Sequence, residues 1–387
     1  MTTQRVYRAA ALSVAIFTGL GVPAALAGPA GWEMPFAENA RLPKDFRQWE
    51  IPRSDGSPLT AFLACLAPAA GAERRPLMIY LDGSGAQSLF VSAGERVGCT
   101  TWGLLAQTAG ARFHVVAAEK RGVKFLDNLR PGVSEGASDD YLRHATLDGR
   151  VADVRVLIDA LANQPAVDSS KIVLVGHSEG AVVAAAVAAV EPRVTHVAFL
   201  SGGGPTQFFD LLVLQRRRLL EAGKSLEEIE TEVSQLERQF GEILAEPQSI
   251  EKFFAGHTYR RWASFGQHPP IDALLKSKCR LFLAHGTEDE SVPIEAFDLL
   301  TVELLRAGRK DVTVHRYAGY DHGLTKRGGK PRRWIGDVFR DVVSWVGEAS
   351  PAADRAGKQS DAGKPGSEKP GAAPAEPDRS APSAEKQ

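Results

Sequence analysis

The chain of 387 residues contains few cysteines and has no excess of either charge. It holds three cysteines and no Cys-x-x-Cys pair, the pattern typical of zinc sites and dithiol redox centres. The Gly-x-x-x-x-Gly-Lys-Ser/Thr loop of nucleotide-binding proteins is also missing from the sequence. The formal net charge is −1, so no overall field favours nucleic acid or an anionic membrane surface as a partner.

The first 27 residues resemble a signal peptide. Arg5 and Arg8 precede an apolar stretch at residues 9–20, and the small residues of Ala25-Leu-Ala27 predict cleavage before Gly28. We therefore expect a periplasmic or secreted protein without a membrane span after cleavage. An uncleaved membrane anchor is the alternative.

Export would place the three cysteines in an oxidising compartment. One disulfide could then form, and we prefer Cys65 with Cys99 because both lie in the N-terminal part of the expected sheet. Three buried free thiols, with Cys279 as the third, is the alternative.

Apolar runs alternate with helical patterns along most of the chain. We expect strands at residues 48–53, 59–66, 77–81, 113–118, 172–175, 194–200, 280–284 and 312–317. We expect helices at residues 102–109, 147–162, 181–190, 294–305 and 333–346. Such alternation predicts an α/β fold with a mostly parallel eight-stranded sheet covered by helices on both faces.

The alternation is interrupted at residues 208–265, which we expect to hold two long helices and no strand. Ser225 and Glu228 form a capping-box pattern at the start of the second helix. One face of that helix is apolar, comprising Leu226, Ile229, Val233, Leu236, Phe240 and Ile243. This face predicts a helical cap at about residues 205–270 that packs on the rest of the protein, with a partner-binding helix as the alternative. We expect the insertion's aromatic residues to form the cap core or line a pocket: Phe208, Phe209, Phe253, Phe254, Tyr259, Trp262 and Phe265.

The two ends of the chain lie outside this pattern. Residues 28–46 are irregular, and residues 349–387 are rich in Pro, Ala, Gly, Lys, Glu and Ser with almost no apolar side chains. A segment of that composition cannot bury a core, so we expect the tail to be disordered. The expected α/β domain therefore covers residues 47–348.

Gly-x-Ser-x-Gly at residues 176–180 stands between an apolar strand and an Ala/Val-rich helix. This is the context of a nucleophile elbow, in which the serine, here Ser178, sits exposed on a strained turn. The same five-residue pattern occurs around Ser134, but there it follows Pro131 and has neither strand nor helix beside it. We therefore interpret Ser134 as a loop residue and Ser178 as a nucleophile.

Eight strands with the elbow after the fifth resemble the α/β-hydrolase fold. The elbow and acid-loop segments are similar to the dienelactone-hydrolase and prolyl-oligopeptidase-like branches of that superfamily. No β-propeller precedes the domain here, which excludes a prolyl oligopeptidase proper. The resemblance implies a catalytic acid and then a histidine after later strands, in the order Ser, Asp or Glu, His.

The acid and the histidine occur where the resemblance places them. His285-Gly-Thr-Glu-Asp-Glu-Ser-Val-Pro293 looks like the family's acid turn and assigns the acid to Asp289, with Glu288 and Glu290 as substitutes if the loop register differs. His322 lies in a Gly-rich turn after the last strand, as the family's histidine does. His315 inside that strand and Asp321 in the turn are expected to be structural.

The resemblance also implies two backbone donors for an oxyanion. One is the N–H of Glu179, directly after the nucleophile. The other comes from Asp82-Gly-Ser-Gly85, where Ser84 is our first choice and Gly83 or Gly85 the next. This chain has Asp82 where many relatives have a histidine.

Spacing assigns no role to the side chains of His177 and Glu179. Arg121, after the fourth strand, is expected to form structural ion pairs.

These residues predict an exported serine hydrolase that cleaves a carboxylic ester through an acyl-enzyme, with no cofactor and no metal. Thioesters and peptide bonds are alternative substrates for the same residues. A non-catalytic binding protein of the cell envelope is the alternative of another class. The expected partner is a small molecule or peptide with a carbonyl centre, and the sequence does not indicate an oligomeric state.

Overall fold

A computed structural model describes residues 31–65, 74–127, 129–326 and 334–348 of the chain. The predicted signal peptide and the predicted disordered tail lie outside the described residues. The described part of segment 28–46 consists of turns with one isolated bridge, from Ala37 to Gln48 of the first strand. None of the described helices combines the length and the apolar character needed to span a bilayer.

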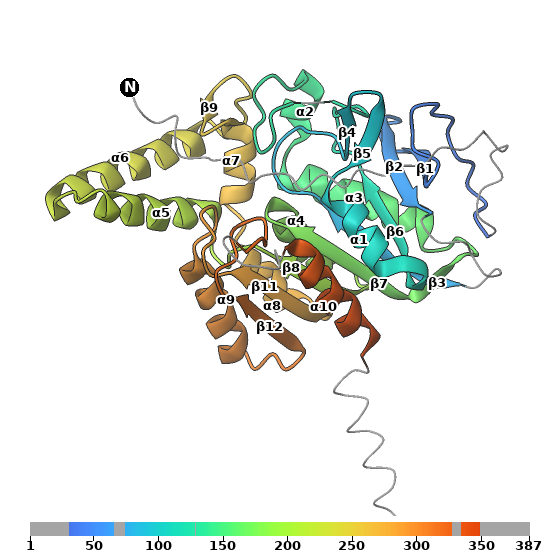
Figure 1. Ribbon diagram of the computed structural model, residues 1–387. Coiled ribbons are helices and arrows are strands. Elements are labelled where there is room, and N and C mark those ends of the chain that lie inside the picture. The colour runs from blue at the N-terminus through green and yellow to red at the C-terminus, as the bar shows by residue number, and fades with distance from the viewer. Residues whose placement is uncertain (1–30, 66–73, 128, 327–333, 349–387) are drawn as a thin grey trace, which may run out of the picture. The chain divides into compact units, whose positions relative to one another are not determined.

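All eight predicted strands are present, and they form one sheet in the order β1-β2-β6-β3-β7-β8-β11-β12 (Figure 1). They are β1 (Phe46–Pro52), β2 (Pro58–Ala64), β3 (Arg75–Leu81), β6 (His114–Ala118), β7 (Val167–His177), β8 (Val194–Leu200), β11 (Arg280–Gly286) and β12 (Val312–Tyr317). β2 pairs antiparallel with both of its neighbours, and the other pairs are parallel. The predicted mostly parallel eight-stranded sheet is confirmed.

Strand β7 is much longer than its apolar pattern suggests. Its first part, Asp168 to Lys171, is polar and largely exposed, so an apolar run marks only the buried end of the strand. An irregularity in the pairing with β3, between Pro76 and Leu77, separates the two parts. The sequence also gave no sign of a small separate hairpin formed by β4 (Phe90–Ala93) and β5 (Arg96–Cys99).

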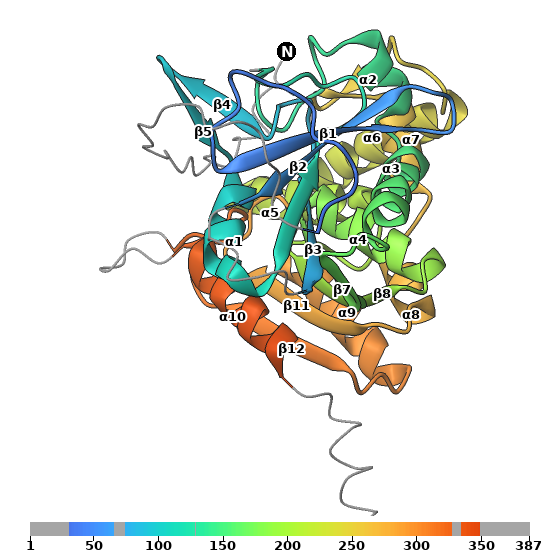
Figure 2. The ribbon, with the colours of Figure 1, turned by 90° about the vertical axis from the view of Figure 1, so that its right-hand side faces the viewer.

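Helices cover both faces of the sheet, as Figure 2 shows. On one face lie α1 (Thr101–Ala109) and α10 (Ile335–Gly347). On the other lie α3 (Leu147–Leu161), α4 (Glu179–Val190), α8 (Pro270–Lys276) and α9 (Ile294–Arg306). Each layer therefore seals a separate apolar core against the sheet.

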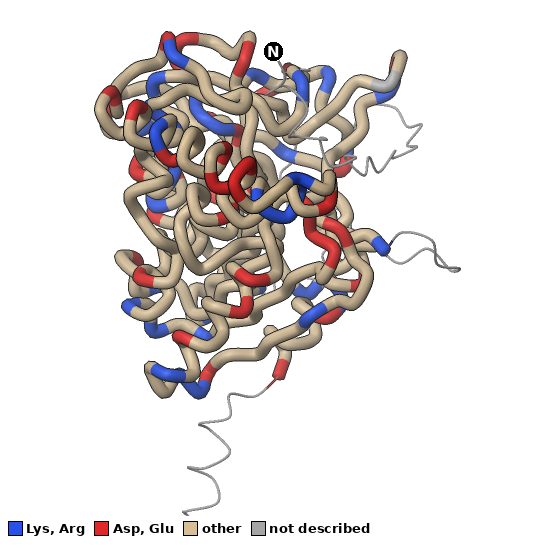
Figure 3. Tube along the Cα trace, turned by 90° about the vertical axis from the view of Figure 1, so that its left-hand side faces the viewer, with Lys and Arg blue, Asp and Glu red and all other residues tan. Residues whose placement is uncertain are grey.

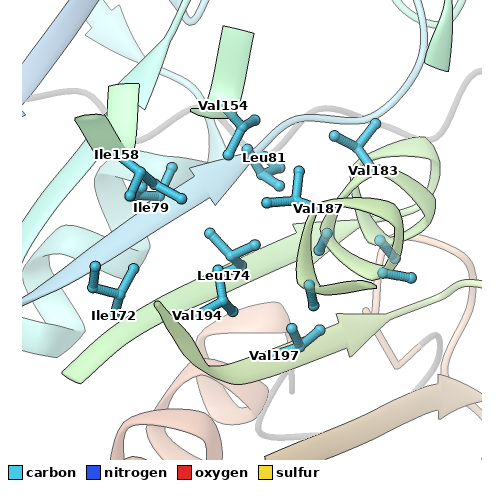
Figure 4. Close-up of a cluster of buried hydrophobic side chains, with 14 of the residues drawn as sticks. Ile79, Leu81, Val154, Ile158, Ile172, Leu174, Val183, Val187, Val194 and Val197 are labelled. Carbon is cyan, nitrogen blue, oxygen red and sulfur yellow. The ribbon is translucent and has the colours of Figure 1, made fainter. Parts of the chain in front are cut away.

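The core beneath α3 and α4 supports the end of β7 that carries Ser178. Aliphatic side chains of β3, β7 and β8 interlock there with Val154 and Ile158 of α3 and Val183 and Val187 of α4 (Figure 4). Fully burying one such side chain stabilises the fold by about 1.5–3 kcal/mol. The tight packing fixes where β7 ends and α4 begins.

The predicted disulfide between Cys65 and Cys99 is wrong, because all three cysteines are free thiols. Cys99 is buried in the core beneath α1 and α10, whereas Cys65 packs against the core on the opposite face of the sheet. The sheet therefore separates the two sulfur atoms. Burial raises the pKa of the Cys65 thiol to about 11 and also raises the pKa of Cys99 and of Cys279.

The insertion between β8 and β11 holds α5 (Gln207–Glu221), α6 (Leu226–Ala245) and α7 (Tyr259–Gly266). The predicted capping box of Ser225 and Glu228 is present at the start of α6. Contrary to expectation, the insertion also contains a short two-stranded ribbon, β9 (Phe253–Phe254) with β10 (His257–Thr258).

Contrary to expectation, the apolar face of α6 packs inside the insertion, against α5 and α7, and not on the rest of the described protein. Leu226, at the start of that face, is exposed. Most of the predicted aromatic residues join this small core, but Phe209 and Phe253 are exposed and Phe265 belongs to the main core. In Figure 1, α5 and α6 form a helical hairpin that extends away from the sheet. Figure 3 shows acidic and basic residues interspersed along the described chain, in keeping with the net charge of −1.

Candidate active site

Ser178 sits on a strained turn between β7 and α4. Its φ of 57° lies in the left-handed region, which costs a non-glycine residue about 1–3 kcal/mol. A Cβ on Gly176 would lie 2.2 Å from the carbonyl oxygen of Gly180, and one on Gly180 would lie 2.0 Å from that of Leu81. Only glycine fits at either position, so the motif reflects how closely strand β3, strand β7 and helix α4 approach one another.

The acid and the histidine meet Ser178 from two later strand ends. His322 Nε2 lies 2.9 Å from Ser178 Oγ, and His322 Nδ1 lies 2.9 Å from both carboxylate oxygens of Asp289. Asp289 is 1% exposed and follows β11, whereas its neighbours Glu288 and Glu290 are exposed. The three predicted side chains therefore form a continuous chain of hydrogen bonds, in which the acid is Asp289. Glu290 instead accepts a hydrogen bond from the backbone N–H of His322 at 3.4 Å.

Backbone donors and charges hold Asp289 ionised. Its Oδ1 accepts hydrogen bonds from the N–H groups of Ser291 and Val292, each at 2.8 Å. Burial alone would raise the pKa of Asp289, but His322 outweighs it and the pKa is lowered. Burial likewise disfavours charge on His322, yet Asp289 outweighs it and raises the pKa of the imidazole.

His177 positions the histidine through the backbone. Its Nε2 lies 2.8 Å from the carbonyl oxygen of His322. Burial lowers the pKa of His177 to about 4, so its ring is neutral near pH 7 and donates the Nε2 proton to that carbonyl. This contact explains a position in the elbow for which the sequence indicated no role.

The loop of residues 82–85 lies beside the nucleophile. A Cβ on Gly83 would sit 3.5 Å from the Ser178 Cβ and 3.9 Å from its Oγ, so Gly83 approaches Ser178 closely. Ser84 lines the same cavity as Ser178. Gly85 instead has a φ of 94° and packs against Gln87 and the backbone of residues 132–133, which marks it as a turn residue.

A buried network of charges holds this loop, the elbow and the cap together. Glu179 accepts a hydrogen bond from Arg150 Nη1 at 2.7 Å and two from Arg261 of the cap, at 3.0 and 2.7 Å. Arg150 also donates to the carbonyl oxygen of Asp82 at 3.0 Å. Lys120 lies 3.4 Å from the Asp82 carboxylate and donates to the carbonyl oxygen of Gly85 at 2.7 Å. Both expected sources of oxyanion donors are thus anchored by one set of ion pairs.

Of the side chains in this network, the sequence patterns indicate only Asp82 and Glu179 as residues near the site. They assign no role to the Glu179 side chain. The sequence does contain one indication that Arg150 is buried, because it lies three residues after Leu147 on the apolar face of its helix. A cation at such a position needs a buried partner. Arg121, by contrast, forms the predicted surface ion pairs, with Asp55 and Asp140.

The serine of the other Gly-x-Ser-x-Gly pattern lies in a loop, as predicted. Its Oγ is buried and lies 2.7 Å from Nδ1 of His257. Ser134 N–H also donates to the carbonyl oxygen of Gly256 at 2.7 Å. These bonds join the loop to the cap, and the residue has no elbow geometry.

A cavity of about 180 Å³ lies over Ser178. The sheet contributes Ser178, His322 and the loop of residues 82–84 to its wall, and the cap contributes Gln207, Asp210, Leu211, Arg261 and Trp262. An apolar cavity of roughly 150 Å³ can hold a molecule the size of benzene. The space over Ser178 is therefore large enough for a small group. Among the described residues, no three His, Cys, Asp or Glu side chains are grouped to hold a metal ion.

The sequence of residues 90–327 matches the alpha/beta hydrolase family, a match that covers more than half of the chain. The chain belongs to this family. No curated protein matches it in sequence. Independently of the family match, the hydrogen bonds that link Ser178, His322 and Asp289 are of a kind that can support nucleophilic attack on a carbonyl.

Several solved structures resemble the fold. The acylaminoacyl peptidase of Pyrococcus horikoshii has a TM-score of 0.52 and 14% identity, and the match covers 80% of this chain and 42% of that one. Est1E from Butyrivibrio proteoclasticus has a TM-score of 0.46 and 15% identity, covering 77% of this chain and 96% of that one. Acetyl xylan esterase 1 from a Thermoanaerobacterium species has a TM-score of 0.48 and 16% identity, and the match covers 82% of this chain and 89% of that one. At 14% identity, the likeness to the peptidase establishes a common fold and no common substrate.

Replacing Glu179 by Gln should destabilise the fold at neutral pH, because Arg150 and Arg261 would remain buried without a carboxylate. Urea unfolding at pH 7 should show a loss of about 3–5 kcal/mol. As a control, Glu230→Gln removes the partner of Arg216 from an exposed pair on the cap and should change stability little.

The loss of stability caused by Glu179→Gln should also depend on pH, which gives a second test of the ion pairs of Glu179 with Arg150 and Arg261. Burial would raise the pKa of Glu179, but Arg261 and Arg150 outweigh it and lower the pKa from 4.5 to about 2. The ionised carboxylate therefore stabilises the fold above pH 4.5, and this contribution disappears as the pH falls towards 2. An equal destabilisation by Glu179→Gln at pH 7 and near pH 2 would contradict this account.

Proposed function

We propose that this protein is a serine hydrolase that cleaves a carboxylic ester through an acyl-enzyme. The observation that carries the proposal is the position of His322, whose two ring nitrogens lie 2.9 Å from Ser178 Oγ and from the Asp289 carboxylate. A serine hydroxyl needs such a base, and the base needs such a carboxylate to orient it and stabilise its charged form.

In the proposed reaction, Ser178 Oγ attacks the ester carbonyl while His322 Nε2 accepts the hydroxyl proton. The resulting tetrahedral oxyanion is stabilised by backbone donors, for which we propose the N–H of Glu179 with that of Ser84 or Gly83. The C–O bond to the alcohol then breaks, and His322 returns its proton to the leaving oxygen. Water, activated by His322, attacks the acyl-enzyme and releases the acid. Asp289 stays ionised and stabilises the imidazolium at each step.

The position of Gly83 supports a contribution from this loop. With a hydrogen atom in place of a side chain facing Ser178, Gly83 leaves room for the substrate carbonyl next to the nucleophile. The network of Arg150, Glu179 and Lys120 would keep both donors in place before the substrate binds. Preorganisation of this kind is a large part of oxyanion stabilisation.

A thioester or a peptide bond would require the same attack, the same proton transfers and the same oxyanion donors. Rates on matched alkyl esters, thioesters and aminoacyl-arylamides would separate these substrate classes. A non-catalytic binding protein is the alternative of another class, and it predicts an unreactive Ser178.

Labelling with a fluorophosphonate tests the proposal directly. The wild type should be labelled at Ser178, and Ser178→Ala should abolish labelling and lower ester hydrolysis by at least about 10³-fold. Ser134→Ala is the matched control, because Ser134 occupies the same five-residue pattern without the elbow. An unlabelled wild type, or equal labelling of Ser178→Ala, would exclude the serine mechanism.

The pH dependence of kcat/KM should reflect His322. The protonated imidazole cannot accept the Ser178 proton, so activity should rise with pH through a midpoint above 6.5, since Asp289 raises the His322 pKa from that value. Asp289→Asn should lower the midpoint and reduce the rate by about 10³–10⁴-fold. Glu288→Gln should leave both unchanged. A midpoint that is the same in Asp289→Asn as in the wild type would contradict the assignment of the acid.

We also propose export, on the pattern of the first 27 residues. Expression of the full chain in a Gram-negative host should yield a periplasmic product whose N-terminal residue is Gly28. Ala27→Arg should block cleavage, because the processing enzyme requires a small residue there. A cytosolic product that retains residues 1–27 would refute the proposal.

A further inference from the structure

Two residues of the cap that line the cavity, Gln207 and Asp210, each hold a buried acceptor atom without a partner in the described chain. Gln207 and Asp210 are three residues apart in the first turn of α5, so they share one face of the helix. Both line the cavity over Ser178. Gln207 Oε1 and Asp210 Oδ1 are both buried and accept no hydrogen bond from any described residue. Buried polar atoms in native proteins nearly always have a partner, so these two call for one from outside the chain.

Asp210 is the more unusual of the two. Asp210 is 4% exposed. Its Oδ1 lies against Gly203, 3.1 Å from the position that a Cβ on Gly203 would occupy. Burial and the negative charge of Asp289 raise the pKa of Asp210 well above its usual value, and no cation opposes them. A carboxyl group in such a place is costly unless a cation or a hydrogen-bond donor joins it.

The buried cations of the cavity wall bind other groups, although Arg261 Nη1 has no hydrogen-bond partner among the described residues. Arg261 binds Glu179 with Nε and Nη2, and its guanidinium lies over the rings of Trp262 and Phe265 at 4.6 and 4.8 Å. Lys120 is engaged by Asp82 and by the carbonyl oxygen of Gly85. On the side of the cavity formed by α5, the unpartnered buried atoms of the described residues are therefore both acceptors, Gln207 Oε1 and Asp210 Oδ1.

We propose that Asp210 and Gln207 form a subsite for a primary ammonium group of the substrate. This inference rests on the proposed function, since it assumes that the cavity over Ser178 receives the substrate. An ammonium group carries a positive charge and three N–H donors with no acceptor. A bound ammonium would lower the pKa of Asp210 and favour its carboxylate form, which with the neighbouring amide oxygen is the complement of those donors. The cavity volume of about 180 Å³ is sufficient for a group about the size of a small amine.

Direct binding of n-butylammonium and n-butanol to the intact protein tests the subsite without requiring turnover. The two probes have the same chain length and differ in charge and donor number. Calorimetric or ligand-observed NMR titration should give a Kd for n-butylammonium at least about tenfold lower than that for n-butanol. In Asp210→Asn, which keeps the shape of the side chain, the two Kd values should agree within about twofold. Asp272→Asn, an exposed change on α8, should keep the wild-type preference.

A second variant keeps the test decisive if Asp210→Asn does not fold. Gln207→Leu removes the other acceptor and should weaken n-butylammonium binding several-fold while leaving n-butanol binding unchanged or stronger. Equal affinities of the two probes for the wild type would overturn the proposal, as would a preference that survives Asp210→Asn. Failure of the proposed function would show differently, as a wild type that fluorophosphonate does not label.

Discussion

The candidate site depends on how closely three backbone segments approach at the end of β7. Gly176 and Gly180 lie so near to each other and to Leu81 that no side chain fits at either glycine. Ser178, between them, is forced to a positive φ. The packed core of β3, β7, β8, α3 and α4 holds the backbone on both sides of Ser178, so the strained conformation is retained. The half-buried position of Ser178 at the cavity is therefore a product of core packing.

The same approach creates an electrostatic problem that the Glu179 network solves. The turn that brings Ser178 to the cavity buries the next side chain, Glu179, which would be costly if it were ionised and alone. Arg150 and Arg261 meet it from α3 and from the cap, and Arg150 reaches on to the carbonyl oxygen of Asp82. The cap is thus attached through the residue that follows the nucleophile. Its placement and that of the loop beside Ser178 are consequences of one ion-pair network.

Much of the architecture could be predicted from local patterns, for identifiable reasons. The central strands of a parallel sheet are buried on both faces, so short apolar runs marked them, and turn glycines marked the elbow and the His322 turn. Asp289 was distinguished from Glu288 and Glu290 only through family resemblance, because three consecutive acids look alike locally. In the structure, the backbone N–H groups of Ser291 and Val292 make the distinction.

Features that depend on distant contacts could not be found in this way. The polar half of β7 is a strand only because β3 pairs with it at Val167 and Asp168. Cys65 and Cys99 were a plausible disulfide pair because both lie in the N-terminal part of the sheet. No sequence pattern indicates on which face of the sheet each thiol lies. Arg261 and Asp210 lie on cap helices whose orientation towards the cavity follows from packing, and neither stands in a motif.

The two walls of the cavity differ in how many of their charged and polar groups are paired, and this difference affects which chemical groups can bind there. Each buried cation beside the oxyanion loop already has a carboxylate, although Arg261 Nη1 has no hydrogen-bond partner among the described residues. On the wall formed by α5, Asp210 and Gln207 retain unpaired acceptors and no cation of the described chain is paired with Asp210. A purely apolar group placed there would displace whatever water those atoms hold and leave them unpaired, at a cost of about 1–3 kcal/mol for each. The cap therefore disfavours apolar groups on that side of the cavity and favours those that donate hydrogen bonds.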